Sequence, residues 1–129
     1  MQRVSGIGGI FFRSRDPEAL SGWYEEHFGI NRVPVDYEQS PWQQESGPTI
    51  IAPFRADTDY FGRAEQAWML NLRVPHLDAL VEYLRGAGIE VTVDPEEYPN
   101  GRFARTHDPE GNPIELWEPR AVPATVNKD

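Results

Sequence analysis

Two stretches of the chain repeat the same or similar residues at a constant spacing, and this repeat restricts the possible folds. The matching pairs, each 60 residues apart, are Arg13 with Arg73, Ala19 with Ala79, Leu20 with Leu80 and Trp23 with Tyr83. Each copy reads as a strand, a helix and three further strands, which predicts two βαβββ modules. Because one helix covers only one face of a small sheet, the two sheets can pack together. The predicted fold class is α+β, a cup-shaped, half-open barrel with the helices outside and a cleft within.

Hydrophobic periodicity and turn residues place the elements of each module. Strands are predicted at residues 7–13, 31–37, 42–45 and 49–54, and again at 67–74, 89–93, 103–107 and 114–117. Helices are predicted at residues 17–28, between the N-cap Asp16 and the terminating Gly29, and at 77–87. We expect a single domain over residues 1–129, with module one at about 5–55, module two at about 66–119 and a polar tail at 120–129.

Composition excludes several classes of function. The formal net charge is −9 with no block of Lys and Arg, which argues against nucleic acid as a partner. No apolar run is long enough for a membrane span, so no membrane association is expected. The absence of cysteine removes thiolate metal ligands and cysteine nucleophiles, and it fits a cytoplasmic location.

The C-terminal strand and the turn before it carry the most informative residues. Residues 108–112 read Asp-Pro-Glu-Gly-Asn, a sequence typical of a tight turn. In the strand that follows, Ile114 and Leu116 point to one face, where a helix can cover them. Glu115 and Trp117 point to the other face, where a carboxylate beside a large aromatic ring suits the lining of a cleft.

These features resemble the vicinal oxygen chelate superfamily, which includes glyoxalase I, fosfomycin and bleomycin resistance proteins, and extradiol dioxygenases. The resemblance lies in the two βαβββ halves, the Asp16-Pro17-Glu18 helix start and the sequence from Asp108 to Leu116, and it covers about residues 5–119. It implies paired modules that form a cup-shaped sheet. Because members often dimerise, it also implies a homodimer.

The superfamily's metal chemistry transfers poorly to this chain. Its enzymes hold a divalent ion with side chains from the first, fifth and last strands, and glyoxalases add one from the strand before the middle loop. Only Glu115 matches, because the first-strand position falls on Gly8 or Gly9 and the fifth-strand position falls on Met69, a thioether that hard ions avoid. Residues 48–54 offer no Asp, Glu, His or Gln. We therefore predict no metal site and no cofactor; a divalent metal bound through Glu115 is the alternative.

Strand parity places a set of side chains in the predicted cleft. They are Met69, Asn71, Arg73, Phe103, Arg105, His107, Glu115 and Trp117. A partly buried carboxylate needs a partner, so Arg105, or else Arg73, is expected to pair with Glu115. The pair can simply stabilise the cup, or its arginine can bind an anionic or vicinal-oxygen ligand. Trp42, Phe103 and Trp117 would supply apolar walls for a small molecule, together with Trp68 unless that residue faces the helices as strict parity suggests.

Three functions are consistent with these residues, which do not decide whether the protein is an enzyme. The first is a metal-independent binding module for a small molecule, in the style of the drug-binding resistance proteins. The second is a lyase, isomerase or dioxygenase-type enzyme acting on a small oxygenated metabolite. It would use Glu115 and His107 as acid and base, or an ion recruited through unusual ligands such as Glu45. The third is a protein-interaction domain that uses Tyr60 and Phe61, two aromatic residues in a polar loop that can form a lid or contact a partner subunit.

One stability comparison tests the predicted pairing of Glu115. If Glu115 is paired in the cup, Glu115→Ala should lower stability more than Glu118→Ala.

Overall fold

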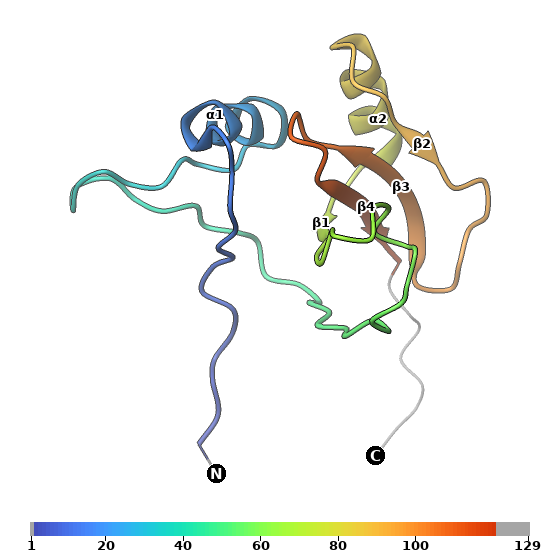
Figure 1. The fold of residues 1–129 in the computed structure, drawn as a ribbon, viewed down its shortest axis with the longest axis horizontal. Coiled ribbons are helices and arrows are strands. Elements are labelled where there is room, and N and C mark those ends of the chain that lie inside the picture. Colours follow the sequence, from blue (N-terminus) through green and yellow to red (C-terminus); the bar gives the residue numbers. More distant parts are fainter. Residues whose placement is uncertain (1, 121–129) are drawn as a thin grey trace. The chain divides into compact units, whose positions relative to one another are not determined.

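The second module forms with the predicted order of elements in the computed structural model, which describes residues 2–120 (Figure 1). Its elements are β1 (Leu70–Arg73), α2 (Leu77–Gly86), β2 (Thr92–Val93), β3 (Gly101–His107) and β4 (Pro113–Pro119). This is a βαβββ module. The α+β fold class is therefore confirmed.

The strands form one open sheet in the order β1-β4-β3-β2. Strand β1 runs parallel to β4, whereas the pairs β3–β4 and β2–β3 are antiparallel. The last strand in the sequence is thus an inner strand with a neighbour on each side. Side chains of β4 can consequently meet side chains from both β1 and β3.

Helix α2 covers one face of this sheet (Figure 1). The apolar side chains buried between the helix and this face of β4 are Leu77, Val81, Leu84, Ile114 and Leu116. Every second residue of β4 is therefore fixed on the helix side, as the alternation predicted. Glu115, between Ile114 and Leu116, must point to the opposite face.

Glu118 fixes the start of α2. Its Oε1 accepts a hydrogen bond of 2.7 Å from the backbone N–H of Leu77, the first residue of the helix. The preceding residue, His76, makes no capping bond with its side chain. Since the first N–H groups of a helix lack partners within the helix, Glu118 acts as a cap supplied by a distant strand. Glu118→Ala is therefore not a suitable control for the Glu115→Ala stability comparison, because it removes a helix cap of its own.

The turn between β3 and β4 is built around the side chain of Asp108, which is only 4% exposed. Its Oδ1 accepts the backbone N–H groups of Glu110 at 2.9 Å and Asn112 at 3.0 Å. Its Oδ2 accepts the Asn112 amide at 2.8 Å. Gly111 takes a positive φ of 85°, a conformation that glycine adopts without strain. The predicted turn is confirmed, and it sets how β4 follows β3.

The first helix also follows the prediction. Helix α1 spans Pro17–Phe28, and the Asp16 side chain accepts a hydrogen bond from the backbone N–H of Ala19. Gly29 ends the helix in the left-handed conformation, with φ 71°. The buried side chains of α1 are Leu20 and Tyr24.

The other elements predicted for module one are not formed in this structure. Within residues 2–120, no strand occurs at residues 7–13, 31–37, 42–45 or 49–54. These segments are interrupted or flanked by glycine and proline, and strands need a hydrogen-bonded neighbour that none of them has here. The βαβββ order is consequently observed once rather than twice.

The chain divides into two compact units, one ending at Trp42 and the other beginning at Gln43. The predicted single domain and its module boundaries at about residues 55 and 66 stay predictions. Within the described residues, no helix has the length and apolar character needed to cross a membrane. Most of the predicted tail, residues 121–129, lies outside the described residues.

Candidate functional site

The sheet face opposite α2 carries a row of polar side chains that crosses three strands. Asn71 on β1 is the register partner of Glu115 on β4, and Glu115 is the register partner of Arg105 on β3. Phe103 and Trp117 form the next pair along β3 and β4. We call Asn71, Phe103, Arg105, Glu115 and Trp117 the Glu115 face. Strand parity predicted these five residues together.

Both carboxylate oxygens of Glu115 accept hydrogen bonds from neutral donors. The Asn71 amide donates to Oε1 at 2.7 Å, and the Tyr60 hydroxyl donates to Oε2. The expected ion pair is absent, because no arginine in the described part of the chain lies within ion-pair distance of Glu115. The predicted pairing with Arg105 or Arg73 is therefore wrong. Two neutral donors satisfy the carboxylate in place of a cation.

Arg105 instead contacts the ring of Tyr60. Its guanidinium carbon lies 4.4 Å from the ring centroid, within the range of a cation–π interaction. Phe54 stacks on the same tyrosine, with 5.7 Å between centroids and 15° between planes. Phe61 contacts Phe54 at 5.0 Å. The loop aromatics therefore form a cluster that reaches the Glu115 face through Tyr60.

The surroundings of Tyr60 change its acidity. Burial, the hydrogen bond to Glu115 and the charge of Glu115 together raise the pKa of Tyr60 to about 12. The nearby Arg105 opposes this increase. The phenol consequently stays protonated and acts as a hydrogen-bond donor at neutral pH.

Phe103 and Trp117 form an apolar floor beside the polar row. Their rings are parallel, with 3° between planes and 6.3 Å between centroids. The Trp117 indole N–H donates to the Asn100 carbonyl at 2.9 Å, which fixes the ring. Tyr98 contacts the edge of Phe103 at 5.8 Å. A fixed aromatic pair next to hydrogen-bonding groups is typical of small-molecule sites.

The Arg73 guanidinium group is held by backbone carbonyls rather than by Glu115. Arg73 donates to the backbone carbonyls of Pro48 at 3.0 Å and Glu45 at 2.8 Å. A side chain at Gly47 would collide with the same guanidinium group. Arg73 therefore holds the segment 45–48 rather than Glu115. Met69 immediately precedes β1 and is half-buried.

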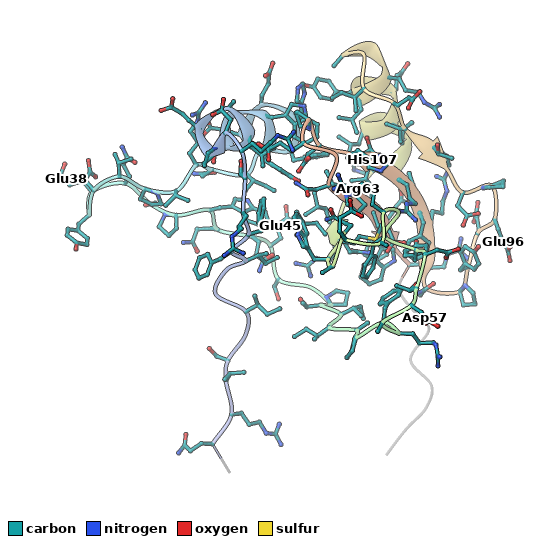
Figure 2. All side chains as sticks on the ribbon, in the orientation of Figure 1. Glu38, Glu45, Asp57, Arg63, Glu96 and His107 are labelled. Atoms are coloured by element: carbon teal, nitrogen blue, oxygen red, sulfur yellow. The ribbon has the colours of Figure 1, made fainter. Side chains whose placement is uncertain are left out.

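Two further residues, His107 and Trp42, were predicted to lie at the cleft. His107 ends β3 and is exposed, and Figure 2 shows it well apart from Asp57 on the loop that carries Tyr60. Within residues 2–120 no hydrogen bond or ion pair joins His107 to Glu115. Trp42 is the last residue of the N-terminal unit and is 41% exposed. Their predicted roles in catalysis and ligand binding stay predictions.

Donors for a metal ion are sparse. Across the described residues, no three His, Cys, Asp or Glu side chains gather closely enough to hold a metal ion. Glu115 is surrounded by an amide, a phenol and a guanidinium group instead. These are donors or weak ligands and do not fit the hard divalent ions of the superfamily.

Sequence reasoning missed the role of Tyr60. The loop was singled out for its two aromatic residues, but nothing in the residue pattern places Tyr60 against Glu115, which follows 55 residues later. The better indication of this contact was Glu115 itself, a carboxylate that needs a hydrogen-bond donor. Once its arginine partners are discounted, a hydroxyl from the aromatic loop is a natural donor.

Comparisons with known proteins agree on one family. The family model of the Glyoxalase-like domain matches residues 9–117. No curated protein matches the sequence.

Several solved structures, including the following three, resemble the chain. The crystal structure of TnmS3, an antibiotic binding protein from Streptomyces sp. CB03234, is 25% identical with a TM-score of 0.60, covering 93% of this chain and 100% of that one. A glyoxylase/bleomycin resistance protein/dioxygenase domain from Frankia sp. EAN1pec is 19% identical with a TM-score of 0.56, covering 92% and 100%. A glyoxalase family protein from Bacillus anthracis is 20% identical with a TM-score of 0.50, covering 80% and 84%. The last two similarities concern the fold alone.

Proposed function

The chain belongs to the glyoxalase-like domain family of the vicinal oxygen chelate superfamily, and on this premise we propose that it binds a small organic molecule at the Glu115 face without the family's metal ion. The similarity to an antibiotic binding protein over nearly the whole chain supports a ligand of antibiotic type. The proposal assigns Arg105, Asn71, Phe103 and Trp117 to ligand binding, with Glu115 as the central acceptor.

The hydrogen bonding of the Glu115 carboxylate carries this proposal. Glu115 is the one residue that matches the superfamily's metal ligands, yet both of its oxygens accept hydrogen bonds, from Asn71 and Tyr60. A metal ligand would instead direct an oxygen toward an ion shared with further anionic or imidazole groups. The arrangement favours recognition of a ligand through hydrogen bonds.

Arg105 supports an oxygen-rich ligand. Among the described residues no carboxylate lies within ion-pair distance of its guanidinium group. The other arginine of the strand, Arg102, forms a 2.9 Å ion pair with Asp78. In a protein of net charge −9, an arginine without an anionic partner is a natural contact for ligand oxygens.

Thermal melting with a panel of aromatic antibiotics tests the proposal. We expect at least one compound to raise the melting temperature of the wild type, since a ligand that binds only the folded state stabilises it. The shift should be lost in Arg105→Ala and kept in Arg102→Ala, a matched control on the same strand. Melting with Mn, Fe, Ni, Zn or Co added singly should give no shift. A large metal-induced shift that disappears in Glu115→Gln would overturn the proposal.

The enzymatic alternative has weaker support. Its two candidate groups, Glu115 and His107, are not joined by a hydrogen bond or ion pair within the described residues, and His107 is exposed. The interaction-domain alternative needs Tyr60 at the surface, whereas this tyrosine is directed onto Glu115. Homodimer formation and a cytoplasmic location belong to the proposal as predictions, supported by the family resemblance and by the lack of cysteine.

A further inference from the structure

Tyr60 is held on the Glu115 face by contacts that resemble those made to a bound molecule. Its hydroxyl donates to Glu115, and its ring lies under the guanidinium group of Arg105. It comes from a loop segment, residues 55–62, that contains no helix or strand. The phenol is therefore bound by residues of the sheet but supplied by an irregular segment.

We propose that the Glu115 face is a site for a phenolic hydroxyl on a planar aromatic ligand, and that Tyr60 occupies this site as an internal ligand until an external phenol displaces it. This inference rests on the proposed function, because it names the chemical class of the ligand bound there.

The groups around the Tyr60 ring select a neutral phenol over other ligands. Since Asn71 occupies one oxygen of Glu115, the other oxygen is directed to the hydroxyl. A hydroxyl bonded to a carboxylate forms a strong, charge-assisted hydrogen bond. A carboxylate at this position would face the charge of Glu115, and a plain hydrocarbon would leave Glu115 without its second donor. The cation of Arg105 favours an electron-rich ring.

Displacement has a measurable consequence. Tyr60 and the ligand compete for Glu115. The apparent association constant of an external phenol is therefore the intrinsic constant multiplied by the fraction of molecules in which Tyr60 has left the site. Shortening Tyr60 should remove this competition and leave a space with the dimensions of its own side chain.

Rescue of Tyr60→Ala by p-cresol, which reproduces the tyrosine side chain, tests the proposal. We expect p-cresol to bind Tyr60→Ala roughly tenfold more tightly than toluene, because one charge-assisted hydrogen bond distinguishes the two probes. The preference should disappear in Tyr60→Ala/Glu115→Gln. Binding is measured by thermal melting and isothermal titration. If Tyr60→Ala does not fold, Tyr60→Leu, which keeps part of the apolar contact, is used in the same comparison.

Equal binding of toluene and p-cresol, or a preference that survives in the double variant, would overturn the phenol site. A second comparison uses the wild type with phenolic antibiotics and their O-methyl ethers. If phenol and ether bind equally, the inference fails while the proposed antibiotic binding stands. If p-cresol rescues Tyr60→Ala but no antibiotic binds the wild type, the phenol site stands and the proposed function fails.

Discussion

At the scale of single residues, the titration of Tyr60 makes stability depend on pH. The phenol has an ordinary pKa of 10.0, and burial together with Glu115 raises the pKa of Tyr60 to about 12 in the folded protein. Between these values the folded state keeps a proton that the unfolded state releases. This contribution to stability is therefore complete below pH 10 and is lost as the pH rises toward about 12.

Urea unfolding at a series of pH values from 9 to 12 measures this loss. The wild type should lose more stability over this range than Tyr60→Phe, which has no phenol to titrate. Glu115→Gln should show a smaller loss than the wild type, because it removes the carboxylate that adds to the shift. Identical pH slopes in the wild type and Tyr60→Phe would contradict the assignment.

The cap at Glu118 gives a second prediction for a single residue. Glu118→Ala should lower the free energy of unfolding by about 1 kcal/mol, because the Leu77 N–H loses its acceptor at the start of α2. Glu118→Gln keeps an oxygen at this position and should retain most of the stability. Urea unfolding measures both variants. A Glu118→Ala protein as stable as the wild type would show that the cap contributes nothing.

The partners of these two glutamates show how far single residues can be predicted. Parity along β4 assigned Glu115 to the face opposite the helix, because side-chain direction in a strand is a local property. The donors to Glu115 come from β1 and from a loop, and the helix capped by Glu118 begins 41 residues earlier. Such pairings depend on the three-dimensional path of the chain, so a pattern within one segment cannot reveal them.

At the scale of elements, the turn between β3 and β4 is the feature whose stability depends most on one side chain. The Asp108 carboxylate accepts three hydrogen bonds, from the Glu110 and Asn112 backbones and the Asn112 amide, at a buried position. Asp108→Ala should lower the free energy of unfolding by about 3 kcal/mol, since hydrogen bonds to charged groups are strong and their buried donors would be left unpaired. Urea unfolding measures the change.

Asp57→Ala is a control for loss of an aspartate at the surface. Asp57 forms an exposed ion pair with Arg55, and its removal should change stability by less than about 0.5 kcal/mol. If the two variants were equally stable, the turn would not depend on the Asp108 side chain.

Elements with strong local signals were predicted well. Helix α1 lies between the capping residue Asp16 and the terminating Gly29, as expected from the sequence. Strand β3 was predicted from residue 103 but begins at Gly101, whose φ of 135° the sequence does not reveal. A side chain there would collide with the Glu118 carbonyl oxygen, so close packing of two backbones explains this glycine. Strand β3 pairs with β4, whereas the strands predicted for module one have no paired neighbour and are absent from the described residues.

At the scale of the whole molecule, the most informative property is the number of large apolar side chains left at the surface. Phe11 is 98% exposed, Val35 is 85% exposed and Tyr37 is fully exposed. Single exposed apolar residues are normal, and we take several nearly bare ones in the N-terminal unit as the candidate interface with another molecule. A second copy of the chain would satisfy the predicted homodimer.

We therefore expect sedimentation equilibrium at micromolar concentration to give the mass of a dimer. Phe11→Glu should weaken dimerisation by about tenfold or more, because a buried aromatic anchor contributes strongly to an interface and a charge there is costly. Tyr83→Glu, at a site on α2 that is 47% exposed, is the matched control and should leave the dimer intact. A wild type that sediments as a monomer would refute the homodimer. A Phe11→Glu dimer as tight as the wild type would move the interface away from residues around Phe11.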